Sequence, residues 1–279
     1  MYDLRFGCQT YPWKMGGHSG EVLRMLETAE KAGFQSLEAE IDMLGTYFEE
    51  PEALEELLEK NHMKFAALVL HQDWEGSGQT EDEKALSKKA IEFVKHFPFA
   101  KIMLSHHAGN TPRGEGGVLE RRRKNLIACM EEVAVQAAEE GIVCCFHPNS
   151  AANSLFRTAE DYEEMFRLLE TTTIGWAPDA GHIENGGMRA LEQMKKHRNL
   201  IRHVHFKDRI SQDEWAVMGE GTIDYPEIIK FLAETDYHGW IMVEDESPRA
   251  AEDSDAVVAL DGAYMCRQIW NGLAGGKSL

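Results

Sequence analysis

Four side chains that could bind a metal ion each stand at the end of a strand-like stretch of the sequence. They are His147, Asp179, His205 and Glu244, in the stretches Ile142–His147, Ile174–Asp179, Ile201–Asp208 and Trp240–Glu244. Two imidazoles and two carboxylates suit a divalent ion of intermediate hardness, so manganese, cobalt, zinc, iron and magnesium are all possible. We expect these residues to bind one such ion, with manganese favoured.

The stretch Ile201–Asp208 has two faces of opposite character. His203, His205 and Lys207 alternate with apolar residues, so they fall on one face of a strand. In an enzyme barrel, such a polar face lines a cavity at the carboxyl end of the strand. Lys207 would there hold a hydroxyl, carboxylate or phosphate of a substrate.

Further polar residues are candidates for substrate binding. His182 follows Asp179 by three residues in a glycine-containing turn, which could fold back over the metal or begin a helix. Asn149 follows His147 closely, and Glu38, His71 and His107 end other strand-like stretches. Loop aromatics could stack on the apolar face of a sugar, namely Trp13, Trp74 and Phe156.

Strand-like and helix-like stretches alternate eight times along the chain, a pattern typical of parallel strands joined by helices. This predicts a single (β/α)8 TIM barrel, class α/β, as one domain over residues 1–279. Its other predicted strands are Leu4–Thr10, Phe34–Glu40, Lys64–His71 and Lys101–His107. In such a barrel all strand ends meet on one face, so the four candidate ligands would meet there too.

Composition limits the partners. Lys and Arg total 29 against 48 Asp and Glu, and the formal charge of -19 disfavours nucleic acid and anionic membrane surfaces. The five cysteines follow no disulfide or zinc-finger spacing, and we see no signal peptide or membrane-spanning run. We therefore expect a cytoplasmic protein, possibly a homo-oligomer, that acts on a small carbohydrate or polyol.

Several motifs resemble the xylose-isomerase-like TIM-barrel superfamily, in particular its sugar phosphate isomerase/epimerase group. The most specific are Asp179-Ala180-Gly181-His182 and His205-Phe206-Lys207-Asp208, and Gly219–Asp224 and Gly239-Trp240 also match. The resemblance implies a divalent metal at the strand ends, with Asp179, His205 and Glu244 at ligand positions, and proton transfer next to a carbonyl. It makes a sugar isomerase or epimerase the leading hypothesis.

One departure from the family pattern favours a second hypothesis. In the epimerases the fifth strand supplies a glutamate that is both ligand and base, whereas this chain has Cys145 and His147 there. The candidate base is then His147 or Glu244. His147 is favoured, because a neutral imidazole can both bind a metal and take a proton near pH 7. Members with a His-Pro element on this strand resemble dehydratases or lyases acting on keto-polyols and keto-sugars, so elimination is the alternative.

Two remoter alternatives remain from the same residues. The superfamily includes endonucleases for abasic DNA, but Arg209–Trp215 lacks the Asp-x-His pair of their three-metal cluster. A binding protein without catalysis would keep the four ligands and turn over no substrate.

Overall fold

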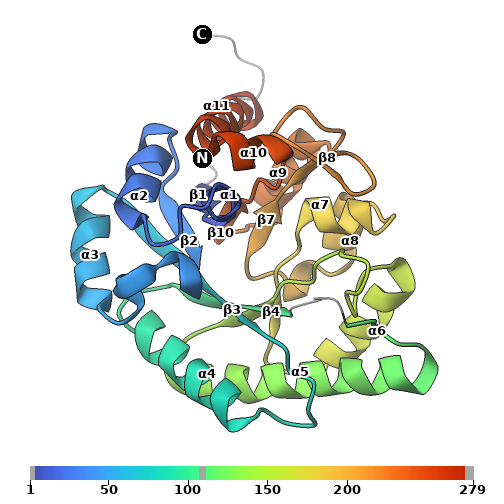
Figure 1. Cartoon of the computed structure of the whole chain (residues 1–279). Coiled ribbons are helices and arrows are strands. Elements are labelled where there is room, and N and C mark those ends of the chain that lie inside the picture. Colours follow the sequence, from blue (N-terminus) through green and yellow to red (C-terminus); the bar gives the residue numbers. More distant parts are fainter. Residues whose placement is uncertain (1–3, 107–110, 274–279) are drawn as a thin grey trace.

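A computed structural model describes residues 4–106 and 111–273, and its centre is a barrel of eight parallel strands surrounded by helices (Figure 1). The predicted α/β TIM barrel is confirmed. That residues 1–279 form one domain stays a prediction. The barrel strands are β1 Arg5–Gln9, β2 Ser36–Glu40, β3 Lys64–Gln72, β4 Lys101–His106, β5 Cys144–Phe146, β6 Gly175–Trp176, β7 Val204–Phe206 and β10 Trp240–Val243.

The strands pair in the order β6-β5-β4-β3-β2-β1-β10-β7, and the barrel closes between β6 and β7. Only two isolated parallel bridges, Trp176 with Ile201 and Asp179 with His205, join these two strands in the described part of the chain. One reason is that Pro178, next to the end of β6, has no backbone N–H to donate. The carbonyl of Pro178 still accepts a hydrogen bond from the N–H of His205 at 2.8 Å.

The helix-like stretches of the sequence form helices between the strands. Two begin with a capping box: Thr80 with Glu83, and Thr158 with Asp161, satisfy each other's free backbone N–H groups. The helices between barrel strands, and the last helix, are α2 Val22–Lys31, α3 Pro51–Lys60, α4 Glu81–Val94, α5 Gly116–Glu139, α6 Ala159–Leu169, α8 Ala190–Lys196, α9 Tyr225–Glu234 and α11 Ser254–Leu273.

Short elements that the sequence pattern does not predict follow the carboxyl ends of the strands. They build much of the rim of the barrel on the side where active sites of this fold form. These elements are α1 Tyr11–Met15, the 3-10 turns η1 Ile41–Met43 and η2 Gly45–Phe48, α7 Ala180–Asn185, the antiparallel hairpin of β8 Asp208–Ser211 and β9 Glu214–Ala216, and α10 Pro248–Glu252. A further 3-10 turn, η3 Arg198–Leu200, precedes β7.

The interior of the barrel is filled by side chains. Ala67, Val69, Met103, Cys145 and Ala177 form a small buried cluster, separate from the larger core between strands and helices. A packed interior leaves the carboxyl end of the barrel as the place for chemistry. No helix in the described residues is long and apolar enough to cross a membrane.

Candidate metal centre

The four predicted ligands meet at the carboxyl end of the barrel. His147 follows β5, Asp179 follows β6, His205 lies in β7 and Glu244 follows β10. One potential ligand atom from each lies within 4.8 Å of those from the other three, and all four side chains are buried. The barrel therefore brings together residues that lie up to 97 positions apart, from 147 to 244, in the sequence.

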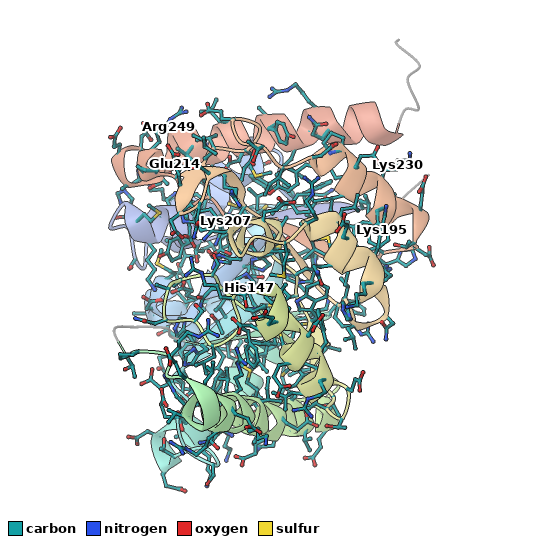
Figure 2. The ribbon with its side chains drawn as sticks, turned by 90° about the vertical axis from the view of Figure 1, so that its right-hand side faces the viewer. His147, Lys195, Lys207, Glu214, Lys230 and Arg249 are labelled. Atoms are coloured by element: carbon teal, nitrogen blue, oxygen red, sulfur yellow. The ribbon has the colours of Figure 1, made fainter. Side chains whose placement is uncertain are left out.

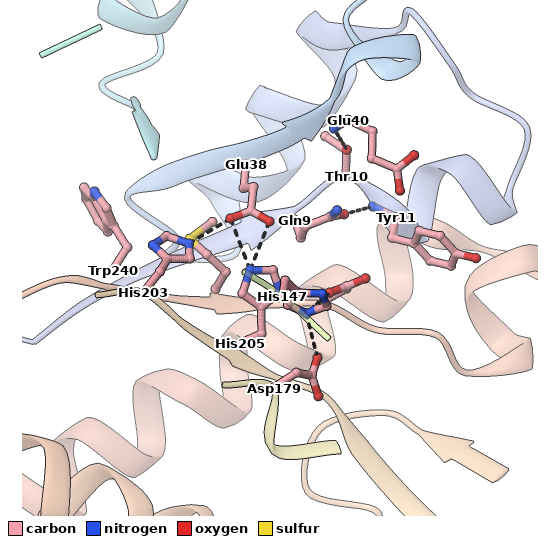
Figure 3. A network of polar contacts seen from close by, with 12 residues as sticks. Gln9, Thr10, Tyr11, Glu38, Glu40, His147, Asp179, His203, His205 and Trp240 are labelled. Atoms are coloured by element: carbon pink, nitrogen blue, oxygen red, sulfur yellow. Dashed lines mark hydrogen bonds and ion pairs between the residues drawn. The ribbon is translucent and has the colours of Figure 1, made fainter. Parts of the chain in front are cut away.

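Two atoms of this cluster lack hydrogen-bond partners. His147 Nε2 lies 3.5 Å from Asp179 Oδ2, the ion pair drawn as a dashed line in Figure 3, and 3.8 Å from Glu244 Oε2. Neither Nε2 nor Oδ2 makes a hydrogen bond in the described structure. Burying such polar groups without partners costs free energy. A cation beside Asp179 Oδ2 would satisfy that oxygen, and His147 Nε2 would either bind the same cation or face a substrate. The donor set thus fits a divalent metal ion.

Asp179 has its second oxygen fixed by the backbone. Oδ1 accepts a hydrogen bond from the N–H of His182 at 2.7 Å, because Asp179 is the N-cap of α7. The other oxygen, Oδ2, is thereby directed into the cluster. Burial acts to raise the pKa of Asp179, but the positive charge of Lys207 lowers it, so the group stays a carboxylate.

His205 is held between two carboxylates. Its Nε2 lies 3.0 Å from Glu38 Oε1, and its Nδ1 lies 2.8 Å from Glu244 Oε2. Against the effect of burial, Glu38 and Glu244 raise the pKa of His205 to about 10 without a metal. If Nε2 carries the proton that is shared with Glu38, the other nitrogen, Nδ1, is the one that could bind a metal beside Glu244.

The structure changes the predicted role of Glu38. This carboxylate lies on β2, is fully buried, and faces His203 Nε2 at 2.8 Å as well as His205 (Figure 3). Burial acts to raise its pKa, but the two imidazoles lower it to about 2. Glu38 borders the cavity, yet its oxygens are directed at imidazoles, so it orients His205 rather than standing free for substrate.

Lys207 is also placed differently from the sequence expectation. Its side chain is fully buried and does not line the cavity, because its ammonium donates to Glu246 at 2.6 Å and lies 3.3 Å from Glu244. Figure 2 shows it in the interior with His147, whereas Lys195 and Lys230 lie at the surface. These carboxylates, with Asp179, keep the pKa of Lys207 raised despite burial.

His182 lies in the first turn of α7, so the glycine-containing turn predicted there is the start of a helix. Its Nε2 is 3.0 Å from Lys207 Nζ and its Nδ1 is 2.9 Å from Ser150 Oγ. Burial and the charge of Lys207 lower its pKa to about 3, so the imidazole is neutral. His182 lines the cavity, as a substrate-binding residue would.

A cavity of about 360 Å³ opens above the cluster, large enough for a small sugar or polyol. Asn149 and His71 line it, and that they bind substrate stays a prediction. His107 lies outside the described residues. Side chains that the sequence reading did not single out also line it, namely Gln9, Tyr11, Ser150, Asn185, Asp213, Trp215 and Glu246.

The structure corrects the predicted role of Trp13. This side chain is fully buried in α1, where its indole N–H donates to Asp255 at 2.7 Å, and it does not line the cavity. Trp74 and Phe156 are buried as well. The tryptophan at the cavity is Trp215 of the β8–β9 hairpin, whose ring lies over Lys207 Nζ.

Sequence signals for two of the overlooked residues exist. Glu246 lies two positions after Glu244, so a period of two extended past the strand points to it. Trp215 lies just after the polar run Ser211–Glu214, which is typical of a hairpin turn.

Comparison with known proteins agrees with this geometry. Residues 26–264 match the family described as Xylose isomerase-like TIM barrel. The chain belongs to this family, and the resemblance inferred from its motifs is confirmed.

Individual relatives are distant. The inosose dehydratase of Clostridium perfringens (strain 13 / Type A) is 26% identical over 236 residues, which cover 73% of this chain and 76% of that protein. The crystal structure of the IOLI protein with a bound zinc atom has a TM-score of 0.77 at 17% identity, covering 96% of this chain and 98% of that one. The 3-keto-D-glucoside 4-epimerase YcjR from E. coli has a TM-score of 0.73 at 17% identity, covering 95% and 99%. The two structures show a shared fold.

Proposed function

We propose that this chain is a metal-dependent lyase that removes water from a keto-polyol or keto-sugar. The observation that carries the proposal is the buried cluster with two atoms that make no hydrogen bond, His147 Nε2 and Asp179 Oδ2, next to an open cavity. Asp179, His205 and Glu244 would hold the ion and leave a coordination position for substrate, as catalytic metal sites do. The bound ion would polarise a substrate carbonyl and so stabilise the enolate.

We favour elimination over epimerisation, which is the leading hypothesis from the sequence. At the end of β5 the cavity offers the imidazole of His147 rather than a second carboxylate. The similarity to an inosose dehydratase supports the same choice. Epimerisation is the second candidate, because it begins with the same proton abstraction next to a carbonyl.

We assign the proton transfer to His147. Glu244 also borders the cavity, but one of its oxygens faces His205 and the other faces Lys207. Burial acts to raise the pKa of Glu244, yet Lys207 and His205 lower it well below its usual value, which makes this carboxylate a poor base. His147 Nε2 makes no hydrogen bond in the described structure, although two carboxylates lie within 3.8 Å of it.

In the proposed reaction a single imidazole first accepts a proton and later donates it. His147 Nε2 takes the proton from the carbon next to the carbonyl, and the electron pair of that C–H bond forms the enolate. When the enolate returns to the carbonyl, its carbon–carbon electron pair forms a new double bond to the next carbon. The C–O bond of the hydroxyl on that carbon breaks at the same time. The protonated imidazole then gives its proton to the departing hydroxide, which leaves as water.

His147→Gln tests this assignment. A lost general base typically costs about 10²–10⁴ in rate, so dehydration and deuterium exchange into a keto-polyol should fall together while the metal stays bound. Product mass spectrometry and metal analysis measure the outcome. Exchange at the wild-type rate would refute the base assignment, and loss of the metal would make His147 a fourth ligand, as the sequence pattern also allows.

The reaction class has its own test. A keto-polyol incubated with the metal-loaded protein in deuterated water should lose the mass of water. Solvent deuterium incorporated with no water lost would instead identify an epimerase or isomerase.

A further inference from the structure

Acidic side chains from several elements line the cavity. They belong to Glu38, Glu40, Asp213, Glu244 and Glu246. Within residues 4–106 and 111–273, no lysine or arginine reaches the cavity lining. A substrate phosphate or carboxylate therefore meets no arginine or lysine side chain of the kind that binds such groups.

The two lysines nearest the cavity are already paired. Lys14 contacts Glu40 and lies 3.0 Å from Asp42. Lys207 is fully buried and has three carboxylates within 3.7 Å, those of Glu246, Glu244 and Asp179. Turning the Lys207 ammonium toward a substrate anion would leave the buried carboxylates of Glu244 and Asp179 without their counter-charge, which costs free energy.

Resting on the function proposed above, we propose that the cavity is selective for uncharged polyols and rejects their phosphate and carboxylate derivatives. Carboxylate oxygens on Glu40 and Glu246 are acceptors for the hydroxyl hydrogens of a polyol. Amide and hydroxyl groups on Asn149, Ser150 and Asn185, which also line the cavity, add donors and acceptors. An anion in the same place faces like charges at close range, which is an effective means of excluding a wrong ligand.

Binding of two matched probes tests the proposal without turnover. The probes are myo-inositol, an uncharged ring polyol, and myo-inositol 1-phosphate, titrated calorimetrically into the metal-loaded protein. We expect the phosphate to bind at least ~100-fold more weakly, because like-charge contact costs several kcal/mol and each 1.4 kcal/mol is tenfold.

Glu40→Gln provides the matched variant, because it removes one carboxylate and leaves Lys14 without its closer partner. The phosphate should gain about tenfold in affinity, whereas exposed Glu234→Gln should change neither ligand. A phosphate that binds wild-type protein as tightly as inositol overturns the proposal, and so does an absence of inositol binding. Selective binding with no reaction of a keto-polyol would instead refute the proposed reaction and leave the charge selectivity standing.

Discussion

Individual side chains at the centre are arranged by their neighbours more than by their own preferences. Glu38 holds one nitrogen of His205, and the N-cap of α7 holds one oxygen of Asp179. In both residues the remaining ligand atom is directed toward the cluster. Partners that fix a ligand in this way commonly tune metal affinity.

At this scale we predict that His205→Ala or Glu244→Ala empties the metal site and abolishes activity. A cation with fewer anionic or imidazole donors competes poorly with its own hydration, and affinity should fall more than about 100-fold, beyond the usual effect of losing a supporting partner. Elemental analysis after dialysis measures this. Glu246→Ala is the control, since Glu246 lies outside the four-atom cluster and should keep the metal. Full occupancy after both ligand substitutions would mean that other residues bind the ion.

Secondary structure elements bring the ligands to one place through close approaches. Gly181, in the first turn of α7, packs so tightly on β7 that an added Cβ would lie 2.3 Å from the carbonyl oxygen of Lys207. This contact explains the glycine between Asp179 and His182, because any side chain would push α7 away from the strand.

We therefore predict that Gly181→Ala destabilises the protein by roughly 1–3 kcal/mol, the usual cost of overpacking, and weakens metal binding by moving Asp179. Gly117→Ala in α5 is the control, because nothing lies within 4 Å of its added Cβ, and it should change stability by at most about 0.5 kcal/mol. Urea unfolding and metal titration of both variants give the comparison. Equal stability of the two would show that α7 can shift without strain.

The whole barrel is joined least firmly where β6 meets β7, and one of the two bridges there is between Asp179 and His205. Both are candidate ligands, so a bound ion would link the two sides of this seam. Metal binding and closure of the barrel should therefore be coupled.

We predict that adding the metal stabilises the protein by about 2.7 kcal/mol when its free concentration is 100 times its dissociation constant. Exchange of the His205 amide, which bonds to Pro178 across the seam, should slow as well. The amide of Ile102, which bonds to Val143 between β4 and β5, serves as the internal reference. If both amides slow to the same extent, the ion stabilises the barrel as a whole and has no special effect at the seam.

Acid stability should depend on Asp161, which ties the start of α6 to its surroundings. Burial acts to raise its pKa, but Arg113, the backbone N–H groups of Thr158 and Arg157, and Arg123 lower it to about 2. A pKa lowered in the folded state contributes stability that is present above the unfolded value near 4 and disappears as the pH falls through about 2.

Asp161→Asn should accordingly lower the free energy of unfolding by about 2 kcal/mol at pH 7, and the difference from wild type should shrink as the pH falls toward 2. Urea unfolding at several pH values measures it, with exposed Asp73→Asn as the control. A difference that stays constant down to pH 2 would contradict the role of the ionised carboxylate.

Sequence alone determined the barrel and the four residues that meet at its carboxyl end. Both follow from local regularities: apolar strands alternating with amphipathic helices, and a polar residue at the end of a strand, such as Asp179 or Glu244. Because the fold gathers all strand ends on one face, position along a strand was enough to predict proximity across the chain.

Only the tertiary structure decided what each polar side chain faces. Lys207 and His205 share a face of one stretch of chain, yet Lys207 is paired with carboxylates from the loop after β10. Trp13 packs against Asp255, which lies 242 positions away. Trp215 reaches the cavity on a hairpin that belongs to no regular strand–helix repeat. Such contacts depend on the paths of loops and on pairing between distant charges, which the period of a single strand or helix does not encode.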